Sequence, residues 1–193
     1  STYIHPVTMV EPVEELFDIF DEKGKHIGTE KRGVVHKTGL WHRSVDVVLI
    51  QRRSNASPLL VIQKRSPLKT VAPSCWDVSC AEHLSPGESF REGAVRGLME
   101  ELGFSVSAQQ LYRLRPQYSA KLDDEERGIR DYEFKELWGM DFDGDTSKIK
   151  IDEDEVVDFK LVSLDTVLEE MRQSPDDYTP WFQEHRSFLE TLL

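Results

Sequence analysis

Cysteine is scarce in this sequence of 193 residues, which contains only Cys75 and Cys80. Two cysteines so close together cannot build a disulfide framework, and they lack the partners of a zinc ribbon. Long hydrophobic runs are also absent: the most apolar stretch, 45–50, is interrupted by Asp46 and is far too short to cross a bilayer. Residues 1–15 carry no signal-peptide pattern. We therefore expect a cytoplasmic protein in a reducing compartment, with no membrane partner.

Basic side chains are outnumbered, because 24 lysines and arginines face 36 acidic residues, which gives a net charge of −12. This excess disfavours nonspecific attraction to nucleic acid, so no nucleic-acid partner is expected. An anionic substrate would need local cations or a bound metal. The chain is long enough for one ordinary domain and short for two, so a single domain over 1–193 is expected.

Short β-compatible runs and helical patterns divide the chain. Two runs around a glycine turn predict an N-terminal β-hairpin over about 15–33. Further strands are expected at 44–51, 59–64, 76–81, 111–114, 132–140 and 156–162. Helical periodicity predicts a helix at 90–102 and C-terminal helices within about 164–192, namely 166–172 and 181–192. The acidic stretch 141–155 is expected to be a mobile loop. The predicted fold class is α/β (α+β), with a mixed β-sheet sandwiched between helices.

The helix predicted at 90–102 carries the clearest local signals. Ser89 and Glu92 form a capping box at its start. On a helical wheel, Glu100 and Glu101 lie opposite the apolar residues. The ordinary explanation of such acids is a solvated face with weak ion pairs. The residues upstream favour a different interpretation.

A strand, a Pro-Gly turn and this helix carry acidic, basic and glycine residues at fixed offsets. Residues 82–104 resemble the Nudix box, whose pattern is G-x5-E-x7-R-E-U-x-E-E-x-G-U, with U an aliphatic residue. Seven of its nine specified positions match when Phe104 is accepted as U. In this chain the pattern reads Glu82-x5-Glu88-x7-Arg96-Gly97-Leu98-Met99-Glu100-Glu101-Leu102-Gly103-Phe104.

The resemblance implies the Nudix fold, with Glu88 and Gly103 as structural residues of the box. It also implies hydrolysis of a diphosphate linkage in a small molecule, a nucleoside diphosphate derivative or a related organic diphosphate. Attack of water on a polyanionic diphosphate needs hard cations, so Mg²⁺ or Mn²⁺ is the expected cofactor. By resemblance, Glu100, Glu101 and the backbone carbonyl of Ala81 hold metal. Relatives occur as monomers and homodimers, and both remain open here.

Two box positions depart from the pattern. Glu82 replaces the first glycine, and Gly97 replaces the glutamate that follows the arginine. The box therefore lacks one ligand or general base. Another segment could supply it, fewer metals could bind, or the site could have lost catalysis.

Glu133 matches the place where relatives bring an additional acid to the metals. Asp131 is two residues away on a predicted strand, so both side chains are expected on one face of the sheet. An ordinary polar strand face is the alternative. By resemblance, Arg96 pairs with Glu88 to hold the loop, and the catalytic candidates are Glu101, Glu133 and Arg96, with Glu101 or Glu133 as the base.

Beyond the box, residues 15–182 resemble the branch related to isopentenyl-diphosphate isomerase, through Leu16-Phe17-Asp18-Ile19, Trp41-His42-Arg43-Ser44-Val45, Gln63-Lys64-Arg65-Ser66 and Thr179-Pro180-Trp181-Phe182. In those isomerases, histidines at such places join acids in a second metal site. The corresponding residues here are His36, His42, His83 and Asp131, with Glu133. Histidines that pack and hydrogen-bond in a hydrolase are the favoured alternative.

The isomerases also need a cysteine directly before the first glycine of the box. Alignment on Trp76, Ser79 and His83 puts Ala81 there and Cys80 one residue earlier. A shift of one residue in a strand turns a side chain to the opposite face, so Cys80 should not substitute. Isomerase activity is therefore disfavoured.

Arg65 and Lys69 match positions that hold the diphosphate in the isomerases, and they follow a predicted strand. A guanidinium fork suits phosphate oxygens, and lysine adds a point charge. Solvated loop cations are the alternative for both. A noncatalytic binding module of the same fold is a third functional class, motivated by Gly97.

Overall fold

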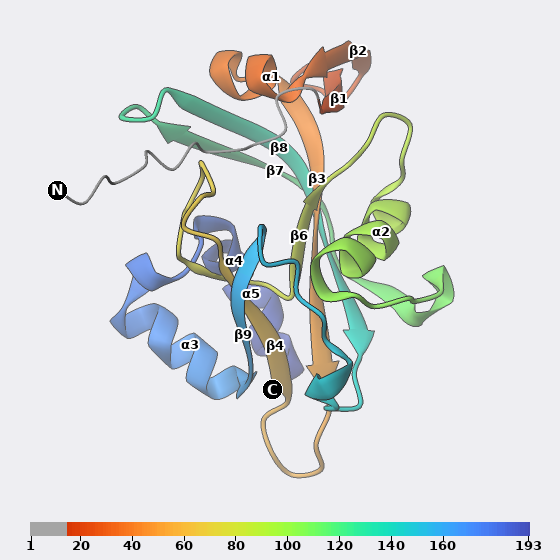
Figure 1. Ribbon diagram of the computed structural model, residues 1–193, viewed down its shortest axis with the longest axis vertical. Coiled ribbons are helices and arrows are strands. Elements are labelled where there is room, and N and C mark those ends of the chain that lie inside the picture. The colour runs from red at the N-terminus through yellow and green to blue at the C-terminus, as the bar shows by residue number, and fades with distance from the viewer. Residues whose placement is uncertain (1–14) are drawn as a thin grey trace, which may run out of the picture.

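The computed structural model describes residues 15–193, and the expectation about a signal peptide concerns residues that lie largely outside this range. Nine strands form one mixed sheet between helices (Figure 1). The strands are β1 (Leu16–Phe20), β2 (His26–Lys31), β3 (Trp41–Gln51), β4 (Leu59–Arg65), β5 (Trp76–Asp77), β6 (Cys80–His83), β7 (Leu111–Asp124), β8 (Ile129–Asp141) and β9 (Val156–Ser163). The helices are α1 (Arg32–Thr38), α2 (Phe90–Leu102), α3 (Leu164–Gln173), α4 (Pro180–Glu184) and α5 (Arg186–Leu189).

Strand β3 is the centre of the sheet. It pairs in parallel with β8 from Trp41↔Tyr132 to Ile50↔Asp141. On its other edge, it pairs antiparallel with β6 near its middle and with β4 at its end. Strand β4 also pairs with β9, and β7 pairs with β8. This arrangement brings β3, β6 and β8, which are far apart in sequence, side by side.

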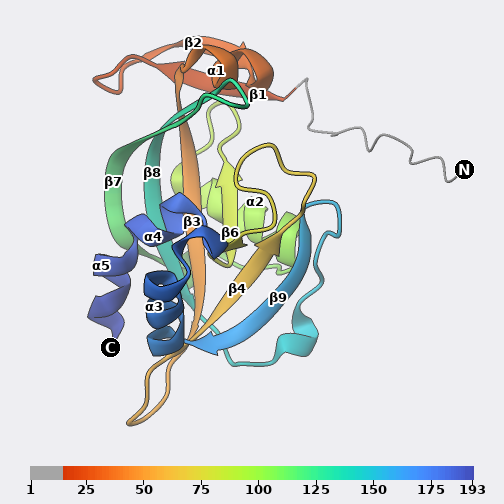
Figure 2. The ribbon, with the colours of Figure 1, turned by 90° about the vertical axis from the view of Figure 1, so that its left-hand side faces the viewer.

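Helices cover both faces of β3, which explains why its apolar run lacks alternation with polar residues. Figure 2 shows α3, α4 and α5 in front of the sheet and α2 behind it. Val47 and Leu49 pack in the core under α2, with Ala94, Leu98 and Leu102. Val48 and Ile50 pack in the opposite core, with Leu164, Leu168 and Phe182.

Several sequence predictions are confirmed. The N-terminal hairpin is formed by β1 and β2. Helix α2 has the predicted bounds, the Ser89–Glu92 capping box is present, and Gly103 ends the helix in the left-handed conformation. The mixed sheet between helices matches the predicted fold class. No helix within residues 15–193 is long and apolar enough to span a membrane.

Other strand and helix boundaries predicted from the sequence were wrong. The single strand expected at 76–81 is two strands, because the Ser79 hydroxyl takes the hydrogen bonds there, accepting from Leu49 N–H and donating to the Val61 carbonyl. Strand β7 extends ten residues beyond the expected 111–114, since its polar second half lies at a sheet edge. The helix expected at 181–192 breaks at His185, whose buried ring bonds to Asp46.

Two further segments differ from expectation. Helix α1 was not predicted, and it begins at Arg32, inside the range expected for the hairpin. The stretch 141–155 contains a 3₁₀ turn, and two backbone bonds tie it to the end of α2: Lys150 N–H donates to the Leu102 carbonyl and Asp152 N–H to the Glu101 carbonyl. This segment therefore forms one wall beside the box helix.

Candidate functional site

Arg96 joins the helix of the box to the loop before it. Its guanidinium forms two hydrogen bonds with the Glu88 carboxylate, both at 2.9 Å, and a third with the His83 carbonyl at 2.7 Å. The remaining nitrogen donates to Glu100 at 3.0 Å. Because the bidentate pair fixes both side chains, the loop 84–89 is held against α2.

The structure separates the two adjacent glutamates of the box. The Glu100 side chain is 55% exposed beside Arg96, whereas Glu101 is buried. The Glu101 carboxylate accepts from Gln63 Nε2 at 2.7 Å and from the Ala81 N–H at 3.3 Å. Burial, and next the charge of Glu82, raise the pKa of Glu101 well above its usual value.

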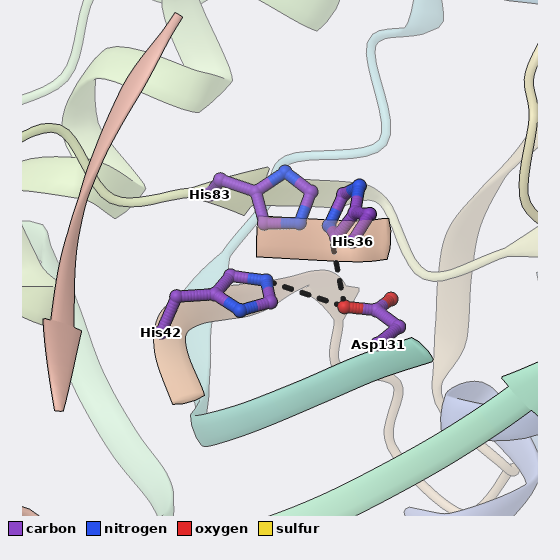
Figure 3. A group of neighbouring side chains, drawn as sticks. All are labelled: His36, His42, His83 and Asp131. Carbon is purple, nitrogen blue, oxygen red and sulfur yellow. Dashed lines mark ion pairs between the residues drawn. The ribbon is translucent and has the colours of Figure 1, made fainter. Parts of the chain in front are cut away.

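A second group of side chains meets where α1, β3, β6 and β8 converge (Figure 3). His36, His42, His83 and Asp131 each offer one ligand atom, and these atoms lie within 4.8 Å of one another. Asp131 Oδ1 is 3.2 Å from His42 Nε2 and 3.4 Å from His36 Nε2. All three of these atoms are buried without a hydrogen-bond partner. Buried polar atoms that converge without hydrogen-bond partners are suited to bind a metal ion, so these four residues form a donor set that fits one.

Glu133 extends this group. Its Oε1 lies 3.4 Å from His83 Nε2 and 3.7 Å from His42 Nε2, and its other oxygen accepts from Lys135 at 3.1 Å. Asp131 and Glu133 are both buried on the same side of β8. The prediction that these two acids share one face of the sheet is confirmed.

The protonation states of Asp131 and His83 also suit a cation. Burial would raise the pKa of Asp131, but the attraction of the nearby His36 and His42 rings outweighs it and holds the value well below its usual range. Burial and then Arg32 lower the pKa of His83 to about 3. A neutral imidazole and an ionised carboxylate are the forms that bind metals.

The histidine cluster opens into a pocket whose empty volume is about 430 Å³ when the open solvent at its mouth is included. Glu82 and Ala81 from β6 line it beside Asp131 and Glu133. Burial raises the pKa of Glu82 to about 7. Three cationic side chains face the same space, namely Arg32, Arg65 and Lys135.

The two predicted substrate cations have different surroundings. The Arg65 guanidinium lines the pocket, donates to the carbonyls of Val71 and Ala72, and reaches Asp77 at 3.3 Å. Lys69 forms an ion pair with Glu155 and does not line the pocket. Their roles in substrate binding stay predictions.

Sequence reasoning missed three pocket residues. Arg32 Nη1 donates to His83 Nδ1 at 3.2 Å and to Glu15 at 3.0 Å. Lys135 is buried and bonds Ser44 at 2.8 Å. Asp46 lies 3.4 Å from Lys135. Only Asp46 left a signal in the sequence, as the one charge inside the apolar run of β3.

Ala81 and Cys80 point to opposite sides of β6, as predicted. Ala81 lines the pocket. Cys80 is fully buried against α2, where its Sγ lies 2.7 Å from the position a Cβ on Gly97 would take. Burial raises the pKa of the Cys80 thiol well above its usual value. Cys80 therefore cannot reach the pocket without a change of register.

Carboxylates, histidines and cations are thus gathered in one pocket. The family model described as NUDIX domain matches residues 40–182. This match covers well over half of the chain, so the protein belongs to the Nudix family.

Individual relatives agree with this assignment. The chain is 42% identical over 101 residues to an uncharacterized Nudix hydrolase of Clostridium acetobutylicum, a match that covers 52% of this chain and 48% of that protein. The chain thus spans about half the length of that relative. It is 28% identical over 166 residues, or 86% of each chain, to the isopentenyl-diphosphate Delta-isomerase of Pectobacterium atrosepticum.

Solved structures show the same fold. A crystal structure of a Deinococcus radiodurans protein superposes with a TM-score of 0.66 and 18% identity, covering 92% of this chain and 99% of that one. The dihydroneopterin triphosphate pyrophosphohydrolase of E. coli gives a TM-score of 0.55 at 15% identity, covering 77% and 92%. At these identities the likeness concerns the fold alone.

Proposed function

We propose that the protein is a Mg²⁺-dependent hydrolase that cleaves the diphosphate linkage of a nucleoside diphosphate derivative or a related small organic diphosphate. The observation that carries this proposal is the composition of the pocket. Carboxylates on β6 and β8 and cations on α1, β4 and β8 line one space. Carboxylates can hold a hard cation, and the cations can hold phosphate oxygens.

In this proposal the box residues hold the catalytic metal. Glu100, Glu101 and the carbonyl of Ala81 are the ligands, and a bound Mg²⁺ would neutralise phosphate charge and lower the pKa of a water molecule. Glu101 or Glu133 accepts the proton of the attacking water. Arg96, which is fixed by its two hydrogen bonds to Glu88, holds the loop 84–89 against the helix α2.

The histidine cluster would hold a second ion. Its mixed imidazole and carboxylate donors suit a transition metal such as Mn²⁺ better than Mg²⁺. The donors are His36, His42, His83 and Asp131, with Glu133 beside them. Arg32 and Arg65 would then orient the diphosphate, because both side chains line the pocket.

Isomerase activity is the second candidate function. The isomerase relatives and the histidine cluster favour it. The burial of Cys80 against α2, with Ala81 at the pocket, opposes it. A noncatalytic binding module is the third, and the retained network around Arg96 opposes that one.

The test is the release of phosphate-bearing cleavage products, either phosphomonoesters or inorganic phosphate, with and without Mg²⁺, from nucleotide sugars, dinucleotides, coenzyme A, thiamine diphosphate and isopentenyl diphosphate. Wild type is compared with Glu101→Gln, and Glu126→Gln, an exposed acid in the β7–β8 turn, is the charge-matched control. We expect Mg²⁺-dependent release that only Glu101→Gln abolishes. Release that survives in Glu101→Gln would refute the assigned role of Glu101.

The other two candidates predict different results. Isomerisation of isopentenyl diphosphate that is lost in Cys80→Ala would establish the isomerase instead. Binding of a nucleotide without any turnover would support the noncatalytic module. Our proposal also includes a single domain over 1–193, a cytoplasmic location and a monomer or homodimer.

A further inference from the structure

Gly97 on α2 faces the strand β6 at very short distance. A Cβ built on Gly97 would lie 2.7 Å from Cys80 Sγ and 3.0 Å from Glu82 Cβ, and Glu82 Cγ is 3.4 Å away. Cβ contacts this short do not occur in well-packed interiors without displacement. The space that a side chain at position 97 would use is thus filled by Cys80 and by the stem of Glu82.

The Glu82 carboxylate lies beside the other box carboxylates. Its Oε2 is 3.6 Å from Arg96 Nη1, the nitrogen that also donates to Glu100 at 3.0 Å. Burial is the largest cause of the raised pKa of Glu101, and the charge of Glu82 is the second. The side chain is 16% exposed and lines the pocket. Glu82 therefore brings a carboxylate to the region between Glu100 and Glu101.

The two departures of this chain from the Nudix pattern are reciprocal. The pattern places glycine on the strand and glutamate on the helix, and this chain has Glu82 on the strand and Gly97 on the helix. Strand and helix are too close here for a side chain at both positions. A glutamate moved to the strand therefore requires a glycine on the helix.

We propose that Glu82 is the third carboxylate of the box metal site and takes the part that the pattern gives to a helix glutamate at position 97. This inference rests on the proposed function. Glu133 is the less suitable replacement, because its two oxygens are directed at His83, His42 and Lys135. Three carboxylates on two rigid elements, together with substrate phosphates, are a donor set that suits Mg²⁺ or Mn²⁺.

The test measures Mn²⁺ binding to the intact chain by electron paramagnetic resonance of the free ion. We expect Glu82→Gln to raise the Kd of one bound Mn²⁺ about tenfold or more and to leave an ion held by the histidines unchanged. Glu126→Gln is the control and should bind as wild type does. Unchanged Mn²⁺ binding in Glu82→Gln would overturn the inference.

A swapped variant distinguishes a ligand from a side chain that merely holds Arg96. Glu82→Gly with Gly97→Glu restores the pattern, and Cys80→Ala removes the 2.7 Å contact. We expect this triple variant to regain Mn²⁺ affinity to within about threefold of wild type, whereas a folded triple variant as weak as Glu82→Gln refutes the exchange. If it does not fold, Glu82→Asp must bind Mn²⁺ more tightly than Glu82→Gln.

Failure of this inference can be told from failure of the proposed function. Wild type that binds no Mn²⁺ and hydrolyses no diphosphate would remove the hydrolase proposal, and the present inference with it. Wild type that binds Mn²⁺ and hydrolyses a diphosphate, with Glu82→Gln binding equally well, would remove the present inference alone.

Discussion

Phe17 stacks against His83, with ring centroids 4.7 Å apart and an interplanar angle of 29°. The same phenyl ring stacks on His42 at 5.2 Å, nearly parallel, and lies 6.0 Å from His36. Phe17 is 1% exposed and comes from β1 of the N-terminal hairpin. The hairpin therefore supplies the apolar floor that keeps three imidazole rings in place.

Replacing Phe17 with alanine should both destabilise the protein and loosen the histidine cluster. A buried Phe→Ala change costs about 3–5 kcal/mol of unfolding free energy, which urea titration would measure. The Kd of a transition metal at the histidines should rise as well. Leu16→Ala is the control, because Leu16 directly precedes Phe17 in the chain but is 46% exposed. Its effect should stay within about 0.5 kcal/mol, and equal losses in the two variants would contradict this role of Phe17.

His83 should make the metal-free protein sensitive to acid. Its pKa is about 3 in the folded state, against an ordinary value of 6.5. The unfolded chain therefore binds more protons below pH 6.5, and stability falls as the pH drops from 6.5 toward 3. Between pH 6.5 and 5 this one group accounts for about 2 kcal/mol.

Urea unfolding in a chelator at pH 7 and pH 5 measures this effect. His83→Gln should lose about 2 kcal/mol less than wild type between the two pH values. His26→Gln, at an exposed histidine of the hairpin, should follow wild type. A pH dependence shared by His83→Gln and wild type would show that His83 is not the group concerned.

Lys135 should be needed for stability as well as for the pocket. Its ammonium group is buried, 3.1 Å from Glu133 and 3.4 Å from Asp46. Lys135→Met leaves these carboxylates without their cation, which costs about 3–5 kcal/mol at buried sites. Urea unfolding measures the loss. Lys23→Met, in the exposed hairpin turn, is the control, and a loss no larger than the control's would disprove the ion-pair argument.

The elements with local signals were predictable from sequence. Helix α2 was predicted with its true bounds, because Ser89, Glu92 and Gly103 act within a turn of the helix ends. The hairpin followed from its glycine turn. The common face of Asp131 and Glu133 followed from the strand period alone. Each of these depends on neighbours a few residues away.

The parts that depend on distant contacts were not predictable. The break between α4 and α5 follows from the buried bond between His185 and Asp46, which are 139 residues apart. Arg32 reaches the pocket through α1, a helix with neither an N-cap side-chain bond nor an acidic first turn. Glu82 on β6 packs against Gly97 on α2, and no local spacing in the sequence predicts this contact between a strand and a helix.

The contact between Gly97 and Cys80 gives the last prediction. Gly97→Ala puts a methyl group 2.7 Å from Cys80 Sγ, so overpacking should cost about 1–3 kcal/mol despite the better helix propensity of alanine.

Gly33→Ala is the matched control. Gly33 also lies in a helix, α1, but nothing lies within 4 Å of the position of its Cβ, so the variant should gain about 0.5–1 kcal/mol. In the Cys80→Ala background the cost of Gly97→Ala should shrink by about 1 kcal/mol, because directly contacting residues couple by that order. Urea unfolding of the four proteins in this cycle measures the coupling. Strict additivity would mean that the helix and β6 can separate, and that Gly97 is not required by close packing.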